Sequence, residues 1–71
     1  MSPDKLVYMA NQIGKFFASQ GDDDAVIAGV ADHLEKYWDP RMRATIQEHF
    51  QHGGRGLDPL VRRAVESLKT I

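Results

Sequence analysis

Apolar residues recur along the chain at the spacing of an α-helix in four separate segments. They follow the i, i+3, i+4, i+7 order that places side chains on one face of a helix, and no segment alternates as a half-buried strand does. These positions are Leu6, Met9, Ala10, Ile13, Phe16 and Phe17; Ile27, Val30, Ala31, Leu34, Tyr37 and Trp38; Met42, Ile46 and Phe50; and Leu57, Leu60, Val61, Ala64, Val65 and Leu68. The pattern predicts four amphipathic helices, at approximately residues 4–20, 23–38, 40–51 and 59–69.

Proline and glycine mark where these helices begin and end. Each proline follows a residue that can cap a helix N-terminus, in the pairs Ser2-Pro3, Asp39-Pro40 and Asp58-Pro59. Gly21 and Gly53 stand where two helices should stop, since glycine accepts the left-handed conformation beyond the last turn. The gap at residues 52–56, rich in glycine, is predicted to be the most flexible internal segment. We therefore expect an all-α fold, a small bundle of four short helices.

The length of the chain, 71 residues, allows a single helical domain (residues 1–71) with a small core. Small proteins often gain stability from disulfides, metals or association. The chain has no cysteine, so we expect association with another chain, with self-association of the isolated protein as one form of it. It has neither a secretory signal nor an apolar run of the roughly 20 residues that span a membrane. We expect a cytoplasmic protein with no membrane contact.

The net charge of −1 conceals an uneven distribution of charge. Residues 1–39 hold three lysines and seven carboxylates, whereas residues 40–71 hold five arginines and one lysine against three carboxylates. Arginine suits bidentate contacts to carboxylates or phosphates better than lysine does. This polarity is compatible with docking on a charged surface, although a solvated face is the commoner explanation.

Residues that could support catalysis or metal binding are too few for either. His49 and His52 stand three apart on a predicted helix, but a closed metal site needs two more ligands, which no Cys or paired His-Glu motif supplies. No serine lies near a base motif. The glycine cluster at residues 53–56 lacks the preceding strand and the Lys-Ser/Thr ending of a phosphate loop. We expect neither a catalytic residue nor a bound cofactor or metal in this chain.

The segment 37–43, Tyr-Trp-Asp-Pro-Arg-Met-Arg, points to a partner contact. Trp, Tyr, Arg and Met are enriched at protein interfaces. For Trp38 alone, packing in the core and contact with a partner are both open. The same corner superficially resembles a helix-turn-helix, and a nucleic-acid-binding regulator that uses Arg41, Arg43, Arg62 and Arg63 is the alternative function. The chain lacks the overall basic charge that such a domain normally has.

Three stretches together resemble a known family. They are residues 6–13 followed by Phe16 and Phe17, residues 33–43 with the core Trp-Asp-Pro-Arg-Met-Arg, and residues 53–61 with Gly-Leu-Asp-Pro-Leu-Val. The sequence resembles the delta subunits of the soluble, molybdenum-containing, NAD-dependent formate dehydrogenases of bacteria. The resemblance extends over nearly the whole chain.

The resemblance implies an accessory subunit of a cytoplasmic complex that oxidises formate and passes the electrons to NAD. It places the molybdopterin cofactor, the iron–sulfur clusters and the FMN in the partner subunits. The chain itself would bind the large catalytic subunit and support its assembly or stability, as a permanent subunit or a transient factor. The candidate partner-binding residues are Tyr37, Trp38, Asp39, Arg41, Met42, Arg43, Arg55, Asp58 and Arg62.

Overall fold

The computed structural model describes residues 2–68, which form four α-helices and contain no strand. The helices are α1 (Pro3–Ala18), α2 (Asp23–Tyr37), α3 (Pro40–Gln51) and α4 (Pro59–Ser67). The predicted all-α class and its four helices are confirmed. No helix among residues 2–68 has both the length and the apolar character needed to cross a bilayer.

Two of the predicted helix ends are wrong by a few residues. α1 stops at Ala18 rather than at residue 20, because the backbone N–H and the hydroxyl of Ser19 both donate to the Phe16 carbonyl, at 3.3 and 2.7 Å. Gly21 is not left-handed; among residues 2–68 positive φ occurs only at Gly53, Gly54 and Gly56. α4 stops at Ser67 and Leu68 is extended, whereas the predicted end at residue 69 lies outside the described residues.

The helix starts follow the capping chemistry of the sequence in three of four cases. Ser2 accepts from the Lys5 amide at 3.5 Å, and Asp22 and Asp39 accept from the third helical amide at 2.9 and 2.8 Å. Each such cap contributes about 1 kcal/mol, because the first helical amides have no partner within the helix. Asp58 occupies the capping position of α4, but its side chain makes no capping hydrogen bond.

The core is formed by buried side chains from all four helices and the segments that follow them. They are Leu6, Val7, Ala10, Val26, Val30, Leu34, Trp38, Ile46, Leu57, Val61, Ala64, Val65 and Leu68. Two members of the predicted stripes, Phe16 and Tyr37, are instead exposed. Phe16 and Phe17 are adjacent and project about 100° apart around the helix, and only Phe17 packs against the core. The two ring centroids lie 5.2 Å apart, with the ring planes at 79°.

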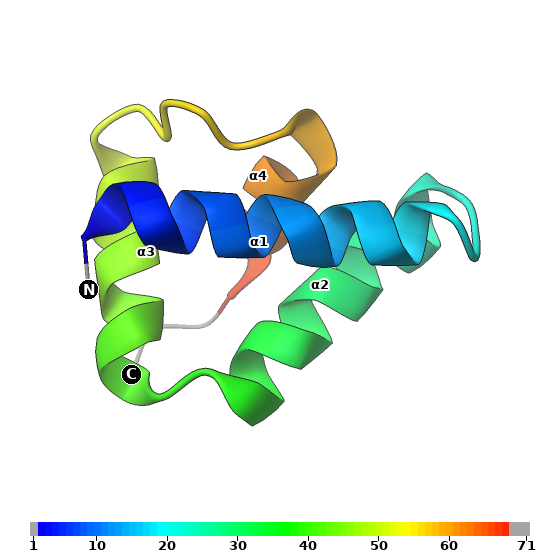
Figure 1. Cartoon of the computed structure of the whole chain (residues 1–71), viewed down its shortest axis with the longest axis horizontal. Coiled ribbons are helices and arrows are strands. Elements are labelled where there is room, and N and C mark those ends of the chain that lie inside the picture. Colours follow the sequence, from blue (N-terminus) through cyan, green and yellow to red (C-terminus); the bar gives the residue numbers. More distant parts are fainter. Residues whose placement is uncertain (1, 69–71) are drawn as a thin grey trace.

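α1 contacts each of the other three helices, as α4 also does. Figure 1 shows it lying across the molecule, beside α3 at its start and beside α2 towards its end, with α4 behind. Its Gly14 allows a close approach to α4, because a Cβ at this position would lie 2.5 Å from Val61 Cγ2. The end of α3 lies beside the start of α1, and the α3–α4 loop then crosses the molecule to the start of α4, beside the second half of α1 (Figure 1).

Candidate functional site

The candidate partner-binding residues form two groups at opposite ends of α3. Residues 37–43 lie at the α2–α3 corner, and residues 55–62 belong to the α3–α4 loop and the start of α4 (Figure 1). Residues 44–51 of α3 lie between the groups, and eight helical residues rise by about 12 Å at 1.5 Å per residue. The structure therefore does not gather these residues into one patch.

Two residues of the corner whose types are enriched at protein interfaces, Trp38 and Arg43, point into the fold. Trp38 is 5% exposed and belongs to the core, so the structure favours packing over partner contact for this side chain. The Arg43 guanidinium donates to the carbonyls of Leu34 (3.4 Å), Glu35 (3.3 Å) and Trp38. These carbonyls belong to the last turn and C-cap of α2, and that of Leu34 also accepts from the Trp38 amide at 3.2 Å. Arg43 therefore caps the end of α2 from α3.

The remaining residues of the corner cap a helix, pack against the core or lie on the surface. The Asp39 carboxylate caps α3, and Met42 packs partly buried against the core. Tyr37 is 74% exposed, and its ring lies 4.8 Å from that of His33. His33 Nδ1 is buried and, among residues 2–68, is the one such side-chain atom without a hydrogen-bond partner. Tyr37 and Arg41 are therefore exposed side chains of the corner.

The other group surrounds the glycine loop, defined here as residues 53–58. Gly53, Gly54 and Gly56 have φ of +112°, +64° and +88°, conformations that residues with a Cβ rarely adopt. Arg62 reaches back from α4, and its Nη2 donates to the carbonyls of Gly53 (2.7 Å) and Gly54 (3.1 Å). The same guanidinium lies over the Phe50 ring, 5.9 Å from its centroid. Arg62 therefore holds the loop rather than projecting into solvent.

Two further side chains fix the same loop from other helices. His49 Nε2 on α3 donates to the Arg55 carbonyl at 2.8 Å. Asn11 on α1 donates from Nδ2 to the Gly56 carbonyl at 2.9 Å and accepts from the Asp58 amide at 3.0 Å. Side chains from three helices thus bind the backbone of the segment that the sequence predicts to be the most flexible. Apart from the family resemblance, no sequence signal singles out Asn11, which lies 45 residues from its partner.

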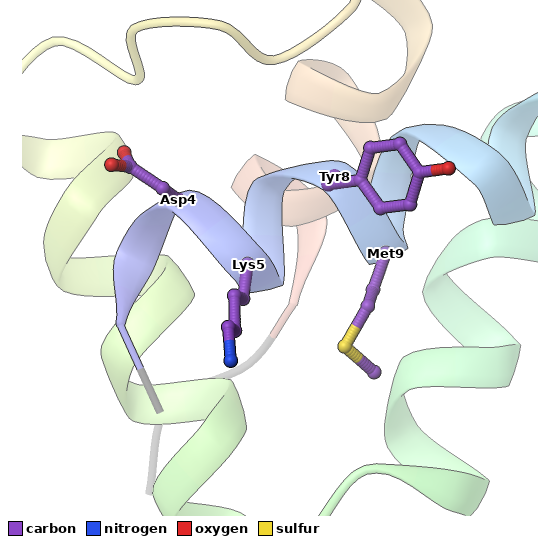
Figure 2. A pocket seen from close by; sticks show the side chains of 4 residues that line it. All are labelled: Asp4, Lys5, Tyr8 and Met9. Carbon is purple, nitrogen blue, oxygen red and sulfur yellow. The ribbon is translucent and has the colours of Figure 1, made fainter.

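The surface formed by residues 2–68 includes three open depressions. One, of about 350 Å³, is lined by Asp4, Lys5, Tyr8 and Met9; Figure 2 shows Lys5 and Met9 extending from the same side of α1, with Tyr8 further out. A second, of about 300 Å³, lies where α1, α2 and the start of α4 meet, and a third, of about 290 Å³, lies beside the end of α3.

None of these three depressions, as lined by residues 2–68, presents a recognisable catalytic or metal-binding set. The third contains both His49 and His52, but each uses one ring nitrogen in a hydrogen bond to a backbone carbonyl, of Arg55 and Glu48 respectively. Within residues 2–68, no group of three or more His, Asp or Glu side chains is placed to hold a metal ion.

Comparison with known proteins identifies the family. The family model for the delta subunit of NADH-dependent formate dehydrogenase matches residues 5–65, which include both candidate groups. Neither the curated proteins nor the solved structures give a match. Because the matched region spans most of the 71 residues, the chain belongs to the family of NADH-dependent formate dehydrogenase delta subunits.

Proposed function

We propose that this chain is a non-catalytic accessory subunit that binds the large catalytic subunit of a formate dehydrogenase and supports its assembly or stability. The observation that carries the proposal is the family match over residues 5–65, since that family is a subunit of a formate dehydrogenase complex. The open depressions and the exposed Tyr8, Phe16 and Tyr37 agree with a protein that works through surface contact.

The redox groups of the reaction are assigned to the partner subunits. The chain has no cysteine, so it offers no thiolate to an iron–sulfur cluster. We propose that the molybdopterin, the iron–sulfur clusters and the FMN are held by the larger subunits, in a cytoplasmic complex. The contribution of this chain is then structural: it covers or orders a surface of the catalytic subunit.

The nucleic-acid alternative loses support from the positions of its arginines. Arg43 and Arg62 bind backbone carbonyls, so two of the four arginines on which the alternative depends are engaged within the fold. The net charge of −1 adds nothing to attract a phosphate backbone.

Co-expression with the other subunits, followed by purification through a tag on the large subunit, tests the proposal. We expect the chain to remain at a fixed ratio in the active enzyme, and the isolated chain to show no NAD reduction with formate. Association during expression but absence from the finished enzyme would identify a transient assembly factor. Failure to associate at any stage would contradict the proposal. Size-exclusion chromatography of the isolated chain would show whether it self-associates.

A further inference from the structure

We propose that the glycine loop is a preformed docking edge whose Arg55 side chain binds a carboxylate of the large catalytic subunit. The inference rests on the proposed function and adds to it a location and a contact chemistry.

Hydrogen bonds from neighbouring helices fix the backbone of the loop. Four consecutive carbonyls, those of residues 53–56, each accept a hydrogen bond from a side chain, and the donors are Arg62, His49 and Asn11. Backbone bonds add to these, from the Gly54 amide to the His49 carbonyl at 2.9 Å and from the Leu57 amide to the Gly54 carbonyl at 3.1 Å. Three helices therefore order the loop before any partner arrives.

Arg55 occupies an exposed position on this loop. It lies between two glycines with positive φ, and its side chain is exposed. Leu57, two residues further on, is buried in the core and fixes the end of the loop. A Cβ at Gly56 would lie 3.3 Å from Val7 Cγ1, so the loop rests closely on α1. Arg55 is the residue of this ordered loop that carries a cationic side chain.

The Arg55 guanidinium has no ion-pair or hydrogen-bond partner among residues 2–68. The ion pair found among residues 2–68 joins Lys36 to Asp32, so no described carboxylate pairs with Arg55. Arg43 and Arg62 donate to carbonyls, whereas no such bond from the Arg55 side chain occurs within residues 2–68. An ordered backbone with an unpaired guanidinium loses less conformational freedom on binding than a flexible loop would.

The guanidinium of Arg55 determines which chemical group of a partner it can bind. The planar guanidinium fits a carboxylate or a phosphate through two parallel hydrogen bonds. The proposed function supplies a protein as the partner, and a side-chain carboxylate is the group of a protein that offers this geometry.

A purely structural explanation makes a different prediction. The side-chain bonds to the loop could serve only to hold Leu57 over the core. In that case the Arg55 side chain, which contributes nothing to those bonds, would be dispensable for binding. The test is therefore to change Arg55 while leaving its carbonyl, and hence its bond with His49, in place.

The experiment measures the affinity of the full chain for the purified large subunit, using wild type, Arg55→Ala and Arg55→Lys. Arg63→Ala is the matched control, because Arg63 is also exposed but lies on α4 outside the loop. We expect Arg55→Ala to raise Kd by about 10- to 100-fold, as loss of an interface arginine does. Arg55→Lys should recover part of the loss, and Arg63→Ala should change Kd by less than about threefold. Far-UV circular dichroism should show the same fold in all four proteins.

Wild-type affinity in Arg55→Ala would overturn the docking edge while leaving the proposed function intact. Full affinity in Arg55→Lys would overturn recognition of a carboxylate through two parallel bonds. Failure of the wild-type chain to bind would instead contradict the proposed function itself. Binding of wild type to a DNA duplex that Arg55→Ala abolishes would overturn the carboxylate in favour of a phosphate partner.

Discussion

The two ends of α3 carry similar residue types and use them differently. At the α2–α3 corner, Trp38 enters the core and Arg43 binds the carbonyls that end α2. At the glycine loop, Arg62 also binds carbonyls, but the backbone it fixes presents Arg55 outward. In both places an arginine turns inward because backbone carbonyls at a helix end or in a loop lie within its reach. An arginine-rich segment therefore indicates docking only where the guanidinium does not donate to a backbone carbonyl of the same fold.

The largest expected effect concerns the two neighbouring aromatic residues of the corner. Trp38→Ala should lower the free energy of unfolding by about 3–5 kcal/mol, because it removes a large buried side chain. Tyr37→Ala should change it by less than about 1 kcal/mol, since that ring is exposed. Denaturant unfolding followed by far-UV circular dichroism measures both. Equal losses would contradict the placement of Trp38 in the core.

The next effect separates the two arginines of the corner. Arg43→Ala should destabilise the fold by about 1.5–3 kcal/mol, because the carbonyls at the end of α2 lose a charged donor. Arg41→Ala should remain within about 0.5 kcal/mol of wild type, since its side chain is exposed. The same unfolding experiment compares them. A larger loss in Arg41→Ala than in Arg43→Ala would contradict the capping role.

A smaller effect is expected at the residue that ties the glycine loop to α1. Asn11→Ala removes two hydrogen bonds, each worth about 1 kcal/mol, and should destabilise the chain by about 1–2 kcal/mol. It should also speed hydrogen exchange at the Asp58 amide, which loses its acceptor. Gln12→Ala, at the exposed neighbouring position, is the control. Unchanged exchange at Asp58 would show that Asn11 does not hold the loop.

The smallest effect distinguishes the caps of α3 and α4. Asp39→Ala should cost about 1 kcal/mol, because its carboxylate binds the Met42 amide. Asp58→Ala should cost only a few tenths of a kcal/mol, through the weak attraction between a carboxylate and the helix dipole. Thermal unfolding of the two variants side by side measures the difference. A larger cost for Asp58→Ala would show that its carboxylate caps α4 in solution.

The helices were predictable from the sequence because their determinants are local. Pro40 follows Asp39, and the spacing of apolar residues sets the inward face, so α3 begins and ends where expected. The periodicity could not decide between adjacent candidates such as Phe16 and Phe17, because both fall near the edge of one stripe. Residues at helix ends were uncertain for the same reason, as Tyr37 and Trp38 show.

The interior roles of the candidate site were not predictable, because they depend on contacts distant in sequence. Arg43 and Arg62 turn inward only once the fold brings carbonyls from other segments beside them. Asn11 meets the glycine loop across 45 residues. The glycines suggested freedom of the loop, and only the three-dimensional arrangement shows that neighbouring helices occupy its carbonyls.

A direct comparison of the two ends of α3 tests the account most simply. The affinity for the large catalytic subunit is measured for Arg55→Ala and Arg41→Ala, which alter one exposed arginine at each end. If the glycine loop is the docking edge, Arg55→Ala raises Kd at least about tenfold more than Arg41→Ala does. The reverse order would contradict this account, because docking would then occur through the α2–α3 corner.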